Sequence, residues 1–377
     1  MARLGDVVRI ETSSKQVMGD KFWLLNLDMV EQQTGNVIAY NYVDRDALNG
    51  SIIQFDTDCV LYSKLRPNLN KVVIPMQDGF ATSEMLPLRP NTKVLTREYL
   101  TVFLRSDSFV TWAVSKTAGA KMPRLGSKEL LGKEIPLPSI SEQMRIAGQF
   151  AKVDELIALR KEQLAKLDQL VKSRFIELFG DPNLNDKGWL MGVINDIGAC
   201  VAGATPSTQV KEYWENGTIP WMSSGEVNKG RVFETDTKIT QLGYDNASTK
   251  LVPPKTVVLA MAGQGRTRGT AAITEIELCT NQSICSIVNN EKVHAEYLLY
   301  FLKLQYMELR GASTNTDGRG GLNLKIIGNY PIMIPPMALQ EQFAAFVEQT
   351  DKSKLAIQQS LDKLELLKKS LMQEYFG

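Results

Sequence analysis

The sequence predicts an α+β protein that contains an internal repeat. Each of the two copies is a mixed α/β segment followed by a long helix. Residues 135–180 align without a gap with residues 332–377 at a shift of 197 positions. The aligned segments also carry apolar residues at an average spacing of 3.5 positions, which is typical of helices that pair along a narrow seam. We therefore expect mixed segments at 1–134 and 181–331, separated by helices in 135–180 and 332–377.

The internal repeat extends beyond what chance matches explain. Identical pairs at the shift of 197 are Pro138/Pro335, Gln143/Gln340, Ala147/Ala344, Asp154/Asp351, Leu164/Leu361, Leu167/Leu364, Ser173/Ser370, Glu177/Glu374 and Phe179/Phe376. The upstream regions align at a shift of 198, where Trp23 meets Trp221 and "EYLTVFL" at 98–104 meets "EYLLYFL" at 296–302. "SRFIELFG" (173–180) and "SLMQEYFG" (370–377) are then the matching ends of two copies.

The mixed segments contain strand-like and helix-like stretches in alternation. "SIIQFDTDCVLYS" (51–63) and "TVVLAMAG" (256–263) are β-branched runs interrupted by turn residues, so they predict strands. "REYLTVFLRS" (97–106) and "AEYLLYFLKLQYMELR" (295–310) predict short amphipathic helices. Turn-rich stretches at 115–127 and 311–323 lie at equivalent places before the two long helices.

The long helices have a continuous apolar stripe. In the first helix the apolar seam residues are Ile146, Phe150, Val153, Ile157, Leu164, Leu167, Val171 and Leu178. In the second they are Phe343, Val347, Ile357, Leu361, Leu364 and Leu371. A lone helix must bury such a stripe, and its own copy is the obvious partner. Two helices of an ordinary bundle remain the alternative, although the flanking segments supply no further bundle helices.

The ends of the first helix carry recognisable signals. Ser139 and Glu142 have the spacing of a capping box, and Gly180 with Pro182 predicts the stop. A helix from 142 to 178 is about 55 Å long at a rise of 1.5 Å per residue.

Composition restricts the class of protein. The chain has 377 residues, a formal net charge of +1, one histidine and four cysteines without a CxxC pair. We expect neither a disulfide framework nor a zinc site. The N-terminal residues lack the apolar core of a signal peptide, and no apolar run approaches the length that spans a bilayer. These features predict a cytoplasmic protein without a membrane segment.

Motifs for catalysis are missing from the sequence. "AGQGRTRGT" (262–270) has the glycines of a phosphate loop but lacks its Lys-Ser/Thr, and no Asn/Asp-Pro-Pro-aromatic motif of an amino-methyltransferase occurs. His294 lies at the head of a predicted helix, where capping or surface exposure is a better interpretation than catalysis. The sequence therefore favours a binding protein with no catalytic residues and no metal site.

Local charge suggests nucleic acid as the ligand. Residues 115–133 include five lysine or arginine residues and one glutamate. Residues 255–270 include three basic residues and no acidic residue. Basic loops neutralise phosphates, and Arg with Asn or Gln can read base edges. A solvated basic loop without a ligand is the alternative for each patch.

These stretches give the chain a resemblance to a known family. "KEIPLPSISEQMRIAGQF" (133–150) is similar to the start of the spacer in the specificity (S, or HsdS) subunits of type I restriction–modification systems. "KGWLMGVINDIGACVAGATPS" (187–207) with "YWENGTIPWMSSGEV" (213–227) resembles the opening of a target-recognition domain in that family. "WLLNLDMVEQQTG" (23–35) and "VLYSKLRPNLNKV" (60–72) do the same for a first domain. Departures are Leu339 in place of Glu142, and the missing "GATPS" string in the first domain.

The resemblance implies a non-catalytic subunit that reads double-stranded DNA. It makes 1–134 and 181–331 target-recognition domains 1 and 2, and 135–180 and 332–377 the central and C-terminal spacers. Each domain would read one half of a bipartite target, and the spacer would set the gap and dock two methyltransferase (M) subunits, with restriction–translocase (R) subunits joining them. The chain itself would hold no cofactor, while S-adenosylmethionine, ATP and Mg²⁺ would bind the partner subunits. A standalone DNA-binding scaffold and a recognition half of a fused methyltransferase or nuclease are the alternatives.

A split target also predicts how the helices pair. Antiparallel helices place the two domains at opposite ends of the spacer, whereas parallel helices would bring them together. We therefore expect an antiparallel coiled coil with pseudo-two-fold symmetry, its length corresponding to roughly 16 base pairs of B-DNA.

The predicted DNA-binding residues follow equivalent strands or precede the long helices. In the first domain they are Lys64, Arg66, Asn68, Lys71, Lys116, Lys121 and Arg124. In the second they are Gln264, Arg266, Thr267, Arg268, Asn315, Arg319 and Asn323. The alternative for "SKLRP" (63–67) is a simple turn after a strand, in which Arg66 ties down the loop.

Overall fold

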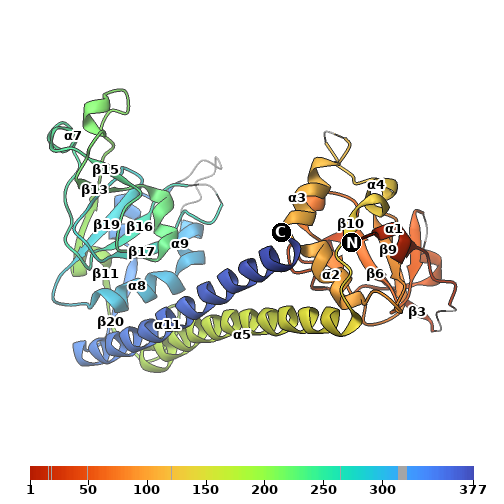
Figure 1. Ribbon diagram of the computed structural model, residues 1–377. Coiled ribbons are helices and arrows are strands. Elements are labelled where there is room, and N and C mark those ends of the chain that lie inside the picture. The colour runs from red at the N-terminus through yellow and green to blue at the C-terminus, as the bar shows by residue number, and fades with distance from the viewer. Residues whose placement is uncertain (16, 18, 49, 120, 264, 313–320) are drawn as a thin grey trace. The chain divides into compact units, whose positions relative to one another are not determined.

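The computed structural model describes the chain except for residues 16, 18, 49, 120, 264 and 313–320. It divides into two compact units, one of residues 1–161 with 358–377 and one of residues 162–357. Each unit combines one mixed α/β segment with one end of each long helix (Figure 1). The α+β class and the twofold repetition of the sequence are thereby confirmed.

The two long helices are α5 (Ile140–Phe179) and α11 (Met337–Phe376), each of 40 residues. The Ser139 hydroxyl accepts a hydrogen bond from the Glu142 N–H (3.3 Å), as predicted for a cap. The second half of the predicted capping box is wrong, because the Glu142 carboxylate instead binds Arg145 at 2.6 Å. Gly180 ends α5 in the left-handed region (φ +79°), and its N–H bonds to the Ile176 carbonyl at 2.8 Å.

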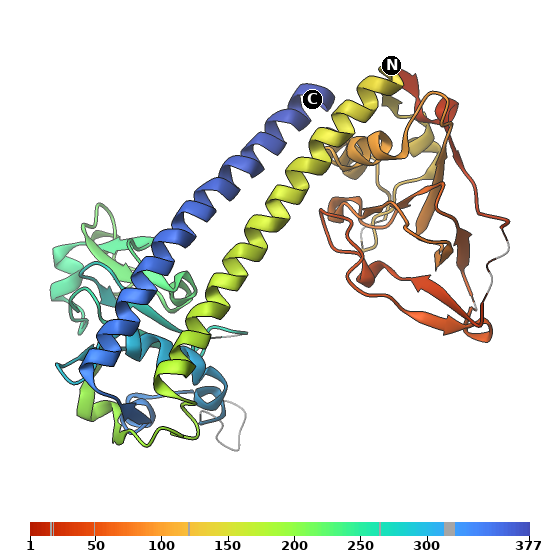
Figure 2. The same cartoon turned by 90° about the horizontal axis from the view of Figure 1, so that it is seen from below.

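Within each unit the ends of α5 and α11 run antiparallel (Figure 2). In the first unit Asp154 pairs with Lys368 at 2.6 Å, and Lys161 pairs with Glu365 at 3.4 Å. In the second unit Asp168 pairs with Lys354 at 2.6 Å. Partner numbers fall on α11 as they rise on α5, so the predicted antiparallel coiled coil is confirmed.

All of the apolar seam residues predicted from the sequence are buried or half-buried in the unit to which they belong. The stripe did not include Phe175 and Phe179, which are both fully buried. These rings lie beside the seam and pack against the mixed segment of the second unit, with Phe179 contacting Tyr297 at 4.8 Å between centroids. The ends of the helices thus serve the domain cores as well as the seam.

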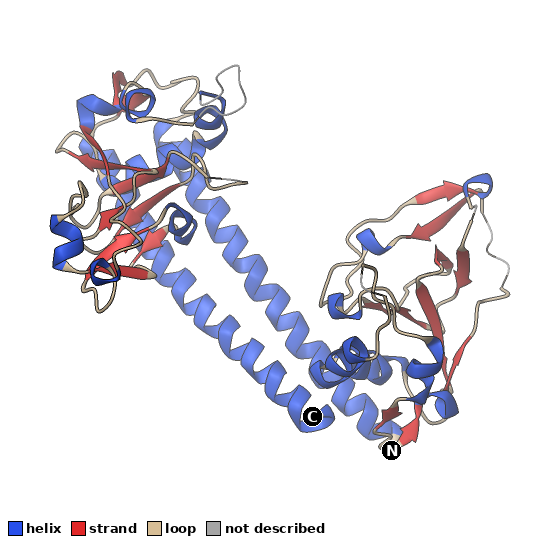
Figure 3. Ribbon diagram, turned by 90° about the horizontal axis from the view of Figure 1, so that it is seen from above, coloured by secondary structure: helices blue, strands red, loops and turns tan. Residues whose placement is uncertain are grey.

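In the described residues of the first unit, ten strands form three sheets, and Figure 3 shows the strands in red. The strands are β1 (Ala2–Arg3), β2 (Val8–Ile10), β3 (Lys21–Leu25), β4 (Tyr42–Asp44), β5 (Ile52–Phe55), β6 (Val60–Ser63), β7 (Val72–Val73), β8 (Gly79–Thr82), β9 (Met85–Pro90) and β10 (Glu134–Ile135). The sheet orders are β2-β9-β6-β7, β4-β3-β8-β5 and β1-β10. All neighbours are antiparallel except β3 and β8.

Short helices complete the first unit. They are α1 (Leu4–Val7), η1 (Leu27–Met29), η2 (Arg45–Ala47), η3 (Pro67–Leu69), α2 (Arg97–Arg105), α3 (Asp107–Ser115) and α4 (Ser127–Gly132). Thr96 and Ser106 cap α2 and α3 through their hydroxyls, which explains why "REYLTVFLRS" ends where a second helix begins. The buried face of α2 joins the core that contains Ile146, Phe150 and Phe376 of the long helices.

The second unit repeats this plan with small changes. Its strands are β11 (Leu190–Val193), β12 (Gly198–Ala202), β13 (Ile219–Met222), β14 (Arg231–Val232), β15 (Thr237–Ile239), β16 (Val257–Ala260), β17 (Ala271–Thr274), β18 (Cys279–Thr280), β19 (Ile284–Asn289) and β20 (Pro331–Ile334). The sheet orders are β12-β19-β16-β17-β14, β15-β13-β18 and β11-β20. The parallel pair β13 and β18 corresponds to β3 and β8, so the topology as well as the sequence is repeated.

The short helices of the second unit largely correspond to those of the first, although η3 has no counterpart among the described residues of the second unit. They are α6 (Ile194–Ile197), η4 (Lys211–Tyr213), η5 (Ser224–Lys229), α7 (Gln241–Asp245), α8 (Ala295–Leu304), α9 (Tyr306–Ala312) and α10 (Leu324–Gly328). The single helix expected over 295–310 is split at Gln305, whose side chain bonds to Asn183 and Tyr330. His294 caps α8, as predicted, by accepting a hydrogen bond from the Glu296 N–H. No helix in the described part of the chain is both long and apolar enough to cross a bilayer.

The first unit holds a buried carboxylate whose ionisation should affect stability. The Asp56 side chain is 1% exposed and binds Arg89 at 2.7 Å and Ser13 at 2.9 Å. Burial alone would raise the pKa of Asp56, but the bonds from Arg89, from the Asp58 N–H and from Ser13 lower it to about 2. Since this pKa lies below its ordinary value of 3.8, the stabilisation is present above pH 4 and is lost as the pH falls toward 2.

We expect acid unfolding of the first unit to reflect this group. Stability of the first unit should fall by about 2 kcal/mol between roughly pH 4 and pH 2 in the wild type. Asp56→Asn should be less stable at pH 7 and should show a flatter dependence over that range. Urea titrations at several pH values would measure both effects, with Asp20→Asn as a control, because Asp20 is an exposed carboxylate outside this cluster. Equal pH slopes for wild type and Asp56→Asn would contradict the assignment.

Candidate nucleic-acid interface

In the first unit the fold joins the two segments in which DNA-binding residues were predicted. The Leu125 N–H bonds to the Lys64 carbonyl at 2.9 Å, and the Arg66 N–H bonds to the Pro123 carbonyl at 2.8 Å. The loop after β6 and the stretch before α4 are therefore neighbours, although about 60 residues separate them in the sequence. We call these two joined segments loop pair 1 (the described residues of 63–71 with 116–125).

The candidate residues of loop pair 1 differ in how exposed their side chains are. Arg66 and Asn68 are exposed, and Lys64 is half-buried. Arg66 takes a left-handed backbone (φ +49°), so its main chain shapes the turn while its guanidinium points to solvent. The turn that was the alternative for "SKLRP" is therefore present, while the DNA-binding role of Arg66 stays a prediction. Lys116 and Lys121 are also exposed.

Two predicted residues of loop pair 1 are engaged within the domain. Arg124 forms a bidentate ion pair with Glu84, at 2.9 to 3.1 Å, and the hydrogen bonds from this partner raise the pKa of the guanidinium. The ammonium of Lys71 donates to the Leu27 carbonyl, and its burial lowers its pKa. Neither contact could be inferred from neighbouring residues, because the partners lie 40 and 44 residues away.

The second unit places its basic residues in an equivalent arrangement. Arg266, Thr267 and Arg268 lie between β16 and β17, and the Leu322 N–H bonds to the Met261 carbonyl at 3.0 Å. The connection between these strands therefore lies beside the segment that leads to α10. We call this surface loop pair 2 (261–270 with 321–323). Gln264, Asn315 and Arg319 lie outside the described residues.

Within loop pair 2, exposure and bonding differ again among the candidates. Arg266 is exposed, whereas Thr267 and Arg268 are half-buried. The Asn323 side chain accepts a hydrogen bond from the Ile326 N–H at 2.9 Å, so it caps α10. Asn323 is therefore occupied by a structural contact, and Arg266 is the most accessible described cation of this loop.

Helix α9 holds the arginine-containing loop, a role that the sequence did not suggest. The Arg310 guanidinium donates to the carbonyls of Gly265 (2.6 Å) and Arg268 (3.4 Å). The Tyr306 hydroxyl donates to the Arg266 carbonyl at 3.1 Å. Tyr306 and Arg310 are four residues apart on one helix face, and this spacing is the only sequence signal that could have indicated a joint role.

The strings that resemble the recognition-domain opening pack against each other. Trp214 donates from Nε1 to the Ser207 carbonyl and Trp221 to the Ala204 carbonyl, both at 3.0 Å. The two indoles meet edge to face at 5.1 Å. They line a cavity of about 400 Å³ with Thr205, Thr208, Lys211, Glu215 and Thr237. The "GATPS" and "YWENGTIPW" segments therefore make structural contacts with each other inside this domain.

The first unit also exposes one isoleucine and two tyrosines that the sequence interpretation missed. Ile38, Tyr40 and Tyr42 are 63%, 54% and 48% exposed. Their spacing of two places them on one face of an extended stretch, which is the signal that could have identified them. Exposed tyrosines can stack on bases or pack against sugars. In the described residues, no group of three or more His, Cys, Asp or Glu side chains is arranged to hold a metal ion.

Comparison with known proteins agrees with the repeated plan. A family model described as the type I restriction modification DNA specificity domain matches residues 2–169 and again residues 186–367. The type I restriction enzyme EcoR124I/EcoR124II specificity subunit of Escherichia coli is 23% identical over 255 residues, which are 65% of this chain and 62% of that protein. The MjaIX specificity subunit of Methanocaldococcus jannaschii is 25% identical over 268 residues, or 67% and 61% of the two chains.

A solved structure shows the same fold. The S subunit of a type I restriction–modification system from M. genitalium superposes with a TM-score of 0.63 at 14% identity, covering 100% of this chain and 95% of that one. The chain spans about three-fifths of the length of the two curated relatives. Because the family model covers nearly all of the chain in two copies, each with its own strand-end loop and long helix, the chain belongs to the type I restriction–modification DNA specificity family.

Proposed function

We propose that this chain selects the DNA target of a type I restriction–modification complex without catalysing a reaction itself. The observation that carries the proposal is the double match to the specificity family, combined with a basic loop pair in each unit. Each recognition domain then reads one half of a bipartite double-stranded target, and the helices set the gap between the halves. The complex acts on DNA in the cytoplasm.

The proposed partners are two methyltransferase subunits and restriction–translocase subunits. S-adenosylmethionine, ATP and Mg²⁺ would bind to those partners, and this chain would hold no cofactor. The long helices offer apolar side chains for docking: Met144, Leu159, Leu170, Leu355, Leu366 and Leu367 are all between 45% and 68% exposed. Leu170 and Leu367 are equivalent in the repeat, which suits two copies of one partner.

The test begins with the DNA sequence itself. We would incubate the purified full chain, alone and with the methyltransferase subunit of its own system, with a randomised double-stranded DNA library. Sequencing of the bound fraction should return two short motifs at a constant gap. Single-molecule mapping of methylation in the host, with and without this gene, should give the same motif. The proposal would be refuted if no DNA sequence were enriched, either by the chain alone or by the chain with the methyltransferase subunit, and if methylation in the host did not depend on the gene.

Arg66 and Arg266 provide a residue-level prediction. Replacing either by alanine should weaken binding to the selected DNA and lower the slope of log K against log salt concentration by about 1, because one phosphate contact is lost. Fluorescence anisotropy at several salt concentrations would measure this. Lys363→Ala is the control, since Lys363 is an exposed cation of α11 outside both loop pairs. Unchanged binding and slope in both arginine variants would remove these residues from the interface.

A further inference from the structure

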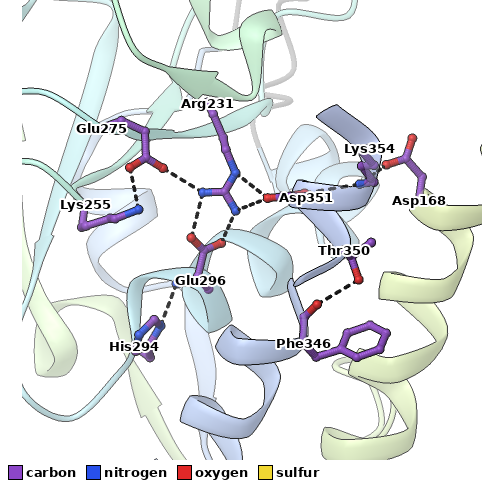
Figure 4. A network of polar contacts seen from close by, with 10 residues as sticks. All are labelled: Asp168, Arg231, Lys255, Glu275, His294, Glu296, Phe346, Thr350, Asp351 and Lys354. Carbon is purple, nitrogen blue, oxygen red and sulfur yellow. Dashed lines mark hydrogen bonds and ion pairs between the residues drawn. The ribbon is translucent and has the colours of Figure 1, made fainter. Parts of the chain in front are cut away.

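A network of charged side chains, half-buried at its centre, connects the second recognition domain to the long helices (Figure 4). At its centre is Arg231, the first residue of β14, whose side chain is 21% exposed. Its guanidinium contacts three carboxylates, those of Glu275, Glu296 and Asp351. They come from the turn after β17, the first turn of α8 and the middle of α11. Each of these residues belongs to the second unit.

Four hydrogen bonds and one further ion-pair contact hold the guanidinium. The Nε–H donates to Asp351 at 2.8 Å, and Nη1 donates to Glu275 at 2.9 Å and to Glu296 at 2.8 Å. Nη2 donates to Glu296 at 2.8 Å and lies 2.7 Å from the Asp351 carboxylate. The planar fork of the guanidinium is thus held by three carboxylates through four hydrogen bonds and one further ion-pair contact. Burial alone would lower the pKa of Arg231, but the bonds and charges of these carboxylates raise it.

The contact to α11 continues to α5. Lys354 lies one turn after Asp351 and is 3.7 Å from it. The same ammonium binds Asp168 of α5 at 2.6 Å. On the other side Glu275 also accepts from Lys255, which lies two residues before β16. One chain of ion pairs therefore runs from the sheet of the recognition domain through Arg231 to both helices of its own unit. We call it the Arg231 clasp (Asp168, Arg231, Lys255, Glu275, Glu296, Asp351 and Lys354).

The first unit lacks this arrangement at the equivalent positions. The repeat aligns Arg231 with Gln33, whose side chain bonds to the Asn68 carbonyl within its own domain. It aligns Glu296 with Glu98, which is 54% exposed and 3.6 Å from Arg97. Asp351 corresponds to Asp154, but Asp154 binds Lys368 of the opposite helix. The described residues at these positions thus join helix to helix in the first unit, and domain to helix in the second.

We propose that Arg231 is a positioning residue that fixes the orientation of the second recognition domain on its helix pair and thereby narrows the range of half-site gaps the protein accepts. The effect on gaps rests on the proposed function; the effect on orientation does not. A planar fork held by carboxylates from three elements resists rotation, whereas apolar packing alone allows small sliding movements. Loss of the Asp351 contact would release the domain from α11 while its core stays intact.

The orientation can be measured without DNA. We would place spin labels at Leu242→Cys in α7 and Leu355→Cys in α11, which are 51% and 61% exposed and belong to the same unit. A Cys200→Ser background is suitable, because the other three cysteines are buried. Asp351→Asn should broaden the distance distribution, and Arg231→Lys should do the same, because an ammonium keeps the charge but not the fork. Asp154→Asn is the matched control and should leave the distribution unchanged.

The consequence for DNA is tested with the target selected from the library. The two half-sites would be presented to the full-length protein, in the form that bound the library, with gaps one or two base pairs shorter or longer than the preferred one. In Asp351→Asn the preference for the best gap over its neighbours should fall by about fivefold or more, while the half-site motifs stay the same. Asp154→Asn should keep the wild-type preference.

The positioning role of Arg231, its effect on half-site spacing and the proposed function can each fail separately. Sharp label distances in both Asp351→Asn and Arg231→Lys, with thermal unfolding that shows folded proteins, would overturn the positioning role. Broad distances with an unchanged gap preference would overturn the link to spacing. If the wild type selects no DNA, the proposed function fails, and the label distances still decide whether Arg231 positions the domain.

Discussion

Phe376→Ala, next to the last residue of the sequence, is expected to destabilise the recognition domain at the beginning of the sequence by about 3–5 kcal/mol. The Phe376 ring is 7% exposed and lies in the core of the first unit. Its centroid is 5.5 Å from Tyr99, 5.8 Å from Phe103 and 6.4 Å from Phe150. Truncation would leave a cavity between α2 and the two long helices.

Hydrogen exchange read by mass spectrometry would locate the effect. In Phe376→Ala, peptides of residues 1–134 should exchange faster, and those of 190–334 should keep their wild-type rates. Phe179→Ala is the matched variant, since Phe179 packs on Tyr297 and Phe343 at 4.8 and 5.6 Å in the second unit. It should show the opposite pattern. Faster exchange of the same unit in both variants would contradict the assignment of each phenylalanine to its core.

Gln143→Met and Gln340→Met are expected to cost about 3 kcal/mol each, because each glutamine makes three buried hydrogen bonds. Gln143 is fully buried, accepts from the Thr96 N–H at 2.9 Å, and donates to the carbonyls of Val94 (2.8 Å) and Pro138 (2.9 Å). Gln340 accepts from the His294 N–H and donates to the carbonyls of Lys292 and Pro335. Each amide thus ties the start of a long helix to the loop before α2 or α8.

The side-chain volume changes little in these variants, so the loss reports on the hydrogen bonds. Chemical denaturation would give the free energy of unfolding, and hydrogen exchange at 94–96 and 292–294 would show where the structure opens. Gln342→Met is the control, because Gln342 is an exposed glutamine of α11. A loss no larger than that of the control would mean that water replaces the amide. This role explains why the glutamine recurs in both copies of the repeat.

Much of the fold could be predicted because its signals are local or repeated. The 3.5-residue spacing of apolar residues, the cap at Ser139 and the stop at Gly180 each depend on a few neighbouring positions. Alignment of the two halves of the sequence identified the loops that are equivalent in them. Lys64 and Arg66, and in the second unit Arg266, were found by this comparison, and the structure places them in equivalent loop pairs.

Contacts between distant residues could not be predicted in the same way. Nothing near Arg124 in the sequence indicates Glu84, and nothing near Arg231 indicates Asp351, which is 120 residues away. Charge counting treats every exposed basic residue alike, so it grouped Lys71 and Arg124 with Arg66. The partner of a charged side chain depends on which elements the fold brings within about 4 Å of it.

The sequence by itself therefore determined that one unit is written twice, that each copy ends in a long helix, and that the family is one of DNA specificity subunits. Periodicity and repetition are enough for this, because they record which face of each element must be buried. Only the tertiary structure decided which cations remain available to a ligand, and that Phe179 and Phe376 each complete the core around the other copy's helix start. It also decided how the two equivalent aspartates differ. Asp351 forms an ion pair with Arg231 of its recognition domain, whereas Asp154 forms one with Lys368 of the opposite helix. Those outcomes depend on distances between residues far apart in the chain, and no local pattern encodes such distances.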